Sequence, residues 1–288
     1  MTTEQCYNDF LKQLTLIYDS REATNITEWV FEIVTGLKRW ERTGNKSVAL
    51  EKDTIQKLEK YLKELLEHKP VQYVLHEAWF YKMKYFVDEH VLIPRPETEE
   101  LVEWLIEVVR ENNLQGREFR ILDVGTGSGC IAVSIKKELM NAVVTGIDVS
   151  VEALQVAKKN AAELHAKISF VTIDFLRESL WNSLGVYDVI VSNPPYIPEN
   201  EKGKLAMNVT AFEPDIALFV ENNYPFVFYD KIAHFAQSHL KHDGKIFVEI
   251  HEEFCQEIQE VFSACNFASE VRKDIYGKER MIKATFRK

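Results

Sequence analysis

The fold of this chain is indicated most clearly by the stretch Arg120-Ile121-Leu122-Asp123-Val124-Gly125-Thr126-Gly127-Ser128-Gly129. It reads as a buried strand that runs into a glycine-rich loop, and the mostly apolar residues 130–135 predict a helix after it. Glycines permit a tight turn and let backbone N–H groups approach a ligand at the N-terminus of a helix. The spacing G-x-G-x-G is tighter than that of dinucleotide sites, and no Lys-Ser or Lys-Thr pair follows as in a P-loop. The candidate binding residues of this loop are Asp123, Gly125, Thr126, Gly127, Ser128 and Gly129.

The next two predicted strands also end in acidic residues. Residues 143–147 lead to Asp148, which in that position suits a ribose diol. Residues 168–173 lead to Asp174 and Phe175, where the acid can accept from an adenine amino group and the ring can cover the base. Either acid alone could be a helix N-cap. Three successive strands that end in this way favour a common binding edge, and the helices between them predict a parallel, doubly wound sheet.

A fourth strand, residues 189–192, is followed by Asn193-Pro194-Pro195-Tyr196. Neither proline has an N–H group and both have a fixed φ, so the strand must end in a stiff loop. In open α/β sheets, ligands bind at this carboxyl edge. A Pro-Pro turn capped by Asn is the plain alternative, because both are ordinary turn residues. The neighbouring strands favour the functional interpretation.

The remaining strands complete the predicted sheet. Residues 245–250 form a fifth strand, and 268–272 and 281–286 form a terminal antiparallel pair. Seven strands with a terminal hairpin resemble the Rossmann-like plan of class I S-adenosylmethionine-dependent methyltransferases. Residues 198–224 are predicted to be loop-rich and could form a flap that carries Phe212-Glu213-Pro214.

The N-terminal part has a different character. Ile55, Leu58, Leu62 and Leu65 recur at helical spacing, and the chain up to about residue 70 predicts a small helical bundle. The bundle could be a packing appendage or a docking surface for a macromolecular substrate. The aromatic and β-branched residues that follow predict a hairpin. We therefore expect a bundle over 1–75, a β-hairpin linker over 76–95 and a catalytic α/β domain over 96–288.

Composition excludes several classes of protein. The 288 residues carry a formal net charge of −10, which argues against affinity gained by neutralising nucleic-acid phosphates. The four scattered cysteines contain no Cys-x-x-Cys pair, and the eight histidines have no ligand spacing, so we expect neither a disulfide framework nor a metal site. The N-terminus lacks signal-peptide features, and no apolar run is long enough to span a bilayer. We expect a cytoplasmic monomer that binds neither membrane nor nucleic acid directly.

Four stretches together resemble one family, the protein-(glutamine-N5) methyltransferases that modify peptide chain release factors. They are Pro70-Val71-Gln72-Tyr73, Ile93-Pro94-Arg95-Pro96-Glu97-Thr98-Glu99, the glycine loop and Asn193-Pro194-Pro195-Tyr196. The second is the most specific marker, because the last is shared with enzymes that methylate adenine N6. The resemblance covers nearly the whole chain. His76 stands where the family usually has glycine, and we expect a local change in the hairpin there.

The resemblance implies S-adenosylmethionine as the donor and, as the substrate, the glutamine of the Gly-Gly-Gln motif in class I release factors. Asn193 Oδ1 and the Pro194 carbonyl could accept the two amide N–H groups, and Tyr196 could pack on the amide plane. Arg95, set between prolines, could either begin a helix or reach the site. The predicted catalytic residues are Asn193, Pro194 and Tyr196; substrate binding adds Pro195, Arg95 and Glu97; and cofactor binding adds Asp148, Asp174, Phe175 and Asn193 to the glycine loop.

Three alternatives compete with this interpretation. An adenine-N6 methyltransferase acting on DNA or RNA shares the Asn-Pro-Pro-Tyr loop, but the net charge and the lack of a basic target-recognition segment argue against it. The glycine spacing argues against an NAD-dependent oxidoreductase. An intact Asn193 argues against a catalytically silent cofactor-binding protein.

Overall fold

The computed structural model describes residues 1–112 and 118–287, and the chain divides into two compact units. The first, the helical unit, comprises residues 1–77 and 206–212. The second, the sheet unit, comprises the described residues of 78–205 and 213–288. Among the residues described, no helix has the length and apolar character needed to cross a membrane.

The helical unit is built from amphipathic helices, as the spacing of its apolar residues predicts. Its core includes Phe10, Phe31, Leu58 and Leu65, all of which are buried. Side chains cap the helix ends. For example, Asp19 Oδ1 accepts hydrogen bonds from the backbone N–H groups of Arg21 and Glu22, in the first turn of the second helix. The helices are α1 (Thr3–Leu14), α2 (Ser20–Thr35), α3 (Arg39–Gly44), α4 (Lys52–Leu66), α5 (Val71–Leu75) and α9 (Met207–Phe212).

The sheet unit begins with the predicted hairpin, β1 (Ala78–Phe80) and β2 (Met83–Tyr85), which pair in antiparallel fashion. Tyr81 and Lys82 adopt φ of 48° and 61°, as a two-residue turn of a twisted hairpin requires. His76 lies outside the hairpin and ends α5 with a left-handed φ of 53°. The departure from glycine therefore affects a helix end, a position that normally favours glycine, and the expectation of a change in the hairpin was wrong.

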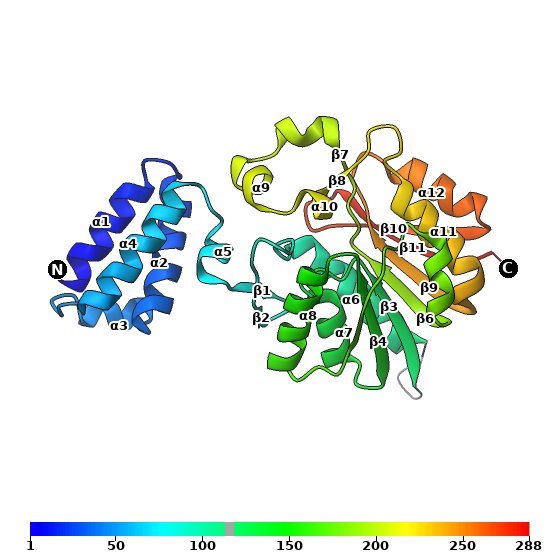
Figure 1. Cartoon of the computed structure of the whole chain (residues 1–288), viewed down its shortest axis with the longest axis horizontal. Coiled ribbons are helices and arrows are strands. Elements are labelled where there is room, and N and C mark those ends of the chain that lie inside the picture. Colours follow the sequence, from blue (N-terminus) through cyan, green and yellow to red (C-terminus); the bar gives the residue numbers. More distant parts are fainter. Residues whose placement is uncertain (113–117, 288) are drawn as a thin grey trace. The chain divides into compact units, whose positions relative to one another are not determined.

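The central sheet has seven strands in the order β10-β11-β9-β6-β3-β4-β5, which confirms the predicted α/β fold class (Figure 1). The five strands from β9 to β5 are parallel to one another, and β10 and β11 add an antiparallel edge. The strands are β3 (Phe119–Val124), β4 (Ala142–Asp148), β5 (Ser169–Thr172), β6 (Tyr187–Ser192), β9 (Leu240–Glu249), β10 (Phe267–Lys273) and β11 (Glu279–Phe286).

Helices cover both faces of the sheet, because successive residues of each strand point to opposite sides. Ile121 and Val189 pack in one core with the first group of helices, whereas Leu122 and Ile190 pack in the other. Figure 1 shows the two groups on opposite faces. The first group is α6 (Pro96–Glu111), α7 (Cys130–Glu138) and α8 (Val151–Glu163), and the second is α11 (Val227–His239) and α12 (Cys255–Ala264).

The segment between β6 and α11 is more regular than the loop that we expected. Ile197 and Phe219 pair in a short parallel bridge, which closes the segment on itself. This pairing joins residues that are distant in sequence, so local composition could not reveal it. The short elements of this segment in the sheet unit are β7 (Ile197–Pro198), η3 (Glu199–Lys204), α10 (Asp215–Leu218) and β8 (Phe219–Val220), and η2 (Glu178–Ser183) precedes β6.

Candidate active site

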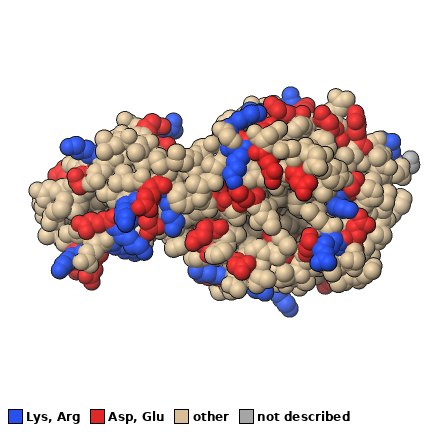
Figure 2. Space-filling view, turned by 45° about the horizontal axis from the view of Figure 1, so that its top comes forward, with Lys and Arg blue, Asp and Glu red and all other residues tan. Residues whose placement is uncertain are grey.

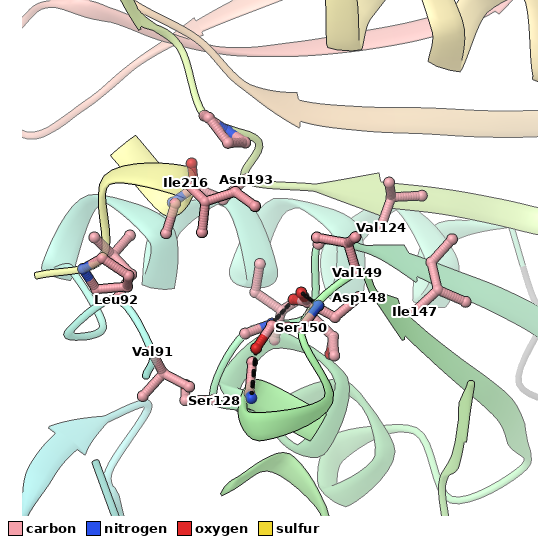
Figure 3. Close-up of a pocket in the computed structure, with 18 of the residues that line it drawn as sticks. Val91, Leu92, Val124, Ser128, Ile147, Asp148, Val149, Ser150, Asn193 and Ile216 are labelled. Carbon is pink, nitrogen blue, oxygen red and sulfur yellow. Dashed lines mark hydrogen bonds between the residues drawn. The ribbon is translucent and has the colours of Figure 1, made fainter. Parts of the chain in front are cut away.

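A cavity of about 350 Å³ lies at the carboxyl ends of the parallel strands. Strand β3 has β4 on one side and β6 on the other, so the chain order reverses there and the loops diverge. Such a switch point is where open α/β sheets bind ligands. Figure 3 shows Asn193 on one side of the cavity and Asp148 and Ser150 on the other. The predicted residues that line it are Arg95, Gly125, Thr126, Gly127, Ser128, Asp148, Asp174, Phe175, Asn193 and Pro195.

The glycine loop owes its shape to left-handed backbone conformations. Gly125, Gly127 and Gly129 have φ of 71°, 52° and 79°, which side chains disfavour. A Cβ on Gly129 would lie 3.1 Å from the Cβ of Ala157, whereas one on Gly125 would meet nothing within 4 Å among the described residues. Gly129 therefore allows close packing of α7 on α8, and Gly125 keeps space open at the cavity.

Asp148 ties this loop to the end of β4. Its Oδ2 accepts from Gly127 N over 2.9 Å, and its Oδ1 accepts from Ser150 N over 2.9 Å. Burial raises the pKa of the Asp148 carboxyl above its usual value, although these backbone hydrogen bonds oppose the shift. Each carboxylate oxygen has a second lone pair, so Asp148 can also accept from hydroxyls of a ligand.

Asp123 lies behind the glycine loop and does not line the cavity that the described residues form. It is fully buried, and its Oδ2 accepts from Thr126 Oγ1 over 2.6 Å. Burial raises the pKa of Asp123 to about 7. Asp123 therefore supports the glycine loop from the protein interior, through its hydrogen bond with Thr126.

Asp174 and Phe175 follow β5 and form another part of the wall. Asp174 Oδ1 accepts from Leu176 N over 3.1 Å, which fixes the carboxylate at the start of the loop. Phe175 is 5% exposed and packs on Trp181 and Phe235, with ring centroids 5.5 and 5.3 Å away. These ring contacts hold Phe175 in place where it lines the cavity.

The Asn193 side chain is held by a chain of hydrogen bonds that begins on α6. Asn193 Nδ2 donates to Thr98 Oγ1 over 3.0 Å, and Thr98 Oγ1 donates to Glu249 Oε2 over 2.6 Å. Tyr196 OH donates to Glu249 Oε1 over 3.1 Å. Burial raises the pKa of Glu249 to about 6, and it raises the pKa of Tyr196 as well. Among the described residues, Pro194 and Tyr196 lie beside the cavity and do not line it.

Arg95 and Glu97 occupy the start of α6, and they differ in their relation to the cavity. Arg95 lines it, and its guanidinium pairs with the buried carboxylate of Glu213. Glu97 is half-buried in the first turn of α6 and lies outside the lining that the described residues provide. The helix start expected at Pro96 is confirmed, because Pro96 is the first residue of α6.

Sequence reasoning missed three polar residues of this region: Thr98, Glu213 and Glu249. Glu249 is the last residue of β9, so the signal that identified Asp123 and Asp148, an acid at the end of a buried strand, was also present there. Glu213 was noticed only as part of a flap. Thr98 was noticed only as part of the stretch 93–99, because its role depends on partners 95 and 151 residues away.

Comparison with known proteins gives concordant results. A family model described as the methyltransferase small domain matches residues 102–212. A release factor glutamine methyltransferase of Flavobacterium psychrophilum is 41% identical, over 96% of this chain and 97% of the relative. A protein of the same description from Bacteroides thetaiotaomicron is 36% identical, over 93% of this chain and 94% of the relative. Another, from Streptococcus pneumoniae, is also 36% identical, over 94% of this chain and 90% of the relative.

Proposed function

The chain belongs to the release factor glutamine methyltransferase family, and we propose that it methylates the side-chain nitrogen of a glutamine in a peptide chain release factor. Family membership implies S-adenosylmethionine as the methyl donor. The observation that carries the proposal is the placement of Asn193. Its carboxamide lies on the cavity wall at the switch point, with its nitrogen bound to Thr98 on the side of α6.

The cavity residues fit S-adenosylmethionine. Apolar side chains such as Val124, Ile147 and Phe175 suit an adenine ring, and the carboxylates of Asp148 and Asp174 suit ribose hydroxyls and an amino group. The left-handed glycine loop allows close approach of the backbone to a ligand. When bound, S-adenosylmethionine supplies an electrophilic methyl group. We assign the glycine loop, Asp148, Asp174, Phe175 and Asn193 to its binding, with Asp123 bracing the loop.

The protein must help an amide nitrogen that is a poor nucleophile, because its lone pair is delocalised into the carbonyl. We assign Asn193 Oδ1 and the Pro194 carbonyl oxygen to accept its two N–H groups. These bonds would orient the nitrogen in line with the methyl group and stabilise the positive charge that develops as the new C–N bond forms. The S–CH3 bond of the donor would break in the same step and leave S-adenosylhomocysteine. One amide proton is then lost to solvent. Both acceptors are neutral, so neither forms a salt bridge with the substrate.

Tyr196, Pro195, Arg95 and Glu97 are assigned to the substrate side of the site. The Tyr196 hydroxyl donates to Glu249, which restrains the ring, and we assign the face of that ring to stabilising the developing cation. Pro195 and Arg95 line the cavity. We further propose that the target is the glutamine of the Gly-Gly-Gln motif in class I release factors, and that the helical unit serves to dock them.

The distribution of surface charge supports a protein substrate over a nucleic acid. The net charge is −10, and on the face that Figure 2 shows, Lys and Arg are scattered among Asp and Glu. A protein that gains affinity from phosphates concentrates basic residues on one face.

The proposal is tested by incubating an unmodified class I release factor with the full chain and S-adenosylmethionine, with adenine-containing DNA and RNA in parallel reactions. Tandem mass spectrometry should locate one added methyl group on the glutamine of the Gly-Gly-Gln motif. A release factor with alanine in place of that glutamine is the matched control and should remain unmodified. Methylated adenine together with unmodified release factor would overturn the proposed substrate.

A further inference from the structure

The hydroxyl of Thr98 joins two groups that lie far apart in the sequence. Thr98 is 3% exposed in the first turn of α6, where Pro96 begins the helix. Its Oγ1 receives a hydrogen bond from Asn193 Nδ2 and donates one to Glu249 Oε2. Glu249 is 1% exposed, so water cannot readily replace either partner.

The directions of these bonds follow from counting hydrogens. A threonine hydroxyl has one hydrogen, and an ionised carboxylate only accepts. The hydrogen of Thr98 is therefore committed to Glu249, and its oxygen can only accept from Asn193. The Asn193 carboxamide must then present its NH₂ group to Thr98 and its oxygen on the other side. A flipped amide would place two acceptor oxygens against each other in a buried site, without a compensating hydrogen bond.

Further contacts keep Glu249 in place as an acceptor. Tyr196 OH donates to its Oε1, and Tyr229 OH donates to its backbone carbonyl over 3.0 Å. The positive charge of Arg280 favours the ionised carboxylate, and the negative charge of Glu97 opposes it. Although burial raises the pKa of Glu249, the value of about 6 leaves the group mostly ionised at neutral pH.

We propose that Thr98, Glu249 and Tyr196 form a relay that fixes the Asn193 carboxamide with its oxygen toward the substrate. This inference rests on the proposed function, since it concerns an amide substrate. A fixed acceptor at that point selects a side chain that offers N–H groups and repels a carboxylate. The relay would thus make the site specific for glutamine over glutamate. Thr98 and Glu249 act through Asn193 and are positioning residues.

The first test compares Thr98→Val, which keeps the shape but removes the hydroxyl, with Thr98→Ser, which keeps the hydroxyl. We expect kcat for release-factor methylation to fall at least about tenfold in Thr98→Val and to recover for the most part in Thr98→Ser. The affinity for S-adenosylmethionine should stay within about twofold of wild type in both, because Thr98 and Asn193 are two of many residues that line the cavity and the glycine loop, Asp148 and Asp174 are unchanged. Thr145→Val, in β4 and outside the cavity lining of the described residues, is the matched control and should match wild type.

The second test needs only the wild-type protein. Nitrogen-15 NMR should show the side-chain NH₂ hydrogens of Asn193 exchanging with solvent at least about tenfold more slowly than those of an exposed asparagine such as Asn200. Equal exchange rates would overturn the relay, even if Thr98→Val fails to fold. A Thr98→Val protein with wild-type kcat would overturn it as well. Absence of methylation by wild type would instead contradict the proposed function and leave the NMR result to decide the orientation of Asn193.

Discussion

Arg95 Nη2 lies 2.5 Å from Glu213 Oε1, although 118 residues separate the two in the chain. Glu213 Oε2 also accepts from Ile93 N over 3.1 Å. One carboxylate therefore holds both the backbone before α6 and the guanidinium on the cavity wall. Its side chain is 1% exposed, whereas that of Arg95 is 32% exposed, so the two partners should respond differently to mutation.

We predict that Arg95→Met destabilises the protein more than Glu213→Gln. The first leaves a buried charge without its partner and should lower the free energy of unfolding by about 2–4 kcal/mol. The second leaves an arginine that can turn to solvent and should cost about 1 kcal/mol. Urea unfolding measures both. Arg110→Met is the matched control for an exposed pair with Glu138, and it should cost less than about 1 kcal/mol. A larger loss of unfolding free energy in Glu213→Gln than in Arg95→Met would contradict this prediction.

Gly129→Ala should lower stability more than Gly125→Ala, whereas Gly125→Ala should lower the affinity for S-adenosylmethionine more. Both must place a side chain at positive φ, which costs about 1–2 kcal/mol. Only Gly129→Ala adds a clash, with Ala157, and we expect about 1–3 kcal/mol of further destabilisation. Only Gly125 lines the cavity formed by the described residues, so Gly125→Ala should weaken binding of S-adenosylmethionine more strongly. Thermal unfolding and calorimetric titration test the pair; equal effects in both assays would contradict the separate roles.

The buried Asp123 predicts a specific dependence of stability on pH. Its pKa of about 7 in the folded protein exceeds that of an unfolded chain, which is close to 4. Between these values the folded state binds more protons, so the free energy of unfolding falls as pH rises from about 4 to 7. The loss for this one group is at most about 4 kcal/mol.

Asp123→Asn should remove this dependence, because the amide does not ionise. Urea unfolding of the ligand-free wild type and of the variant at pH 5 and pH 8 measures the effect. We expect the variant to gain stability relative to wild type as the pH rises. A constant difference between the two proteins across this range would show that Asp123 does not titrate there.

Much of the sheet unit could be predicted from sequence because its signals are local. The glycines from Gly125 onward and the Pro-Pro pair after Asn193 each mark the end of a strand that its apolar residues predict. The parallel topology then brings those ends to one edge, which is where the structure places the cavity.

The remaining features depend on contacts between distant segments. The orientation of the Asn193 amide requires Thr98 from α6 and Glu249 from β9, and no local pattern links these three. The pairing of Ile197 with Phe219 is likewise set by tertiary structure. The interior position of Asp123 follows from how the loop folds over it, because an acid at a strand end can face a ligand or support the loop.

The central claim is that Asn193 acts on the substrate amide during methyl transfer. The measurement that tests it most directly is single-turnover methylation of a class I release factor by wild type and Asn193→Ala at saturating S-adenosylmethionine. Tandem mass spectrometry reads the methylated glutamine, and calorimetry measures the affinity for the donor. We predict that Asn193→Ala lowers the rate by about a hundredfold or more. The affinity for the donor should fall only slightly, because Asn193 is one of many residues that line the cavity and the glycine loop, Asp148 and Asp174 are unchanged. A variant with near-normal turnover would contradict the account.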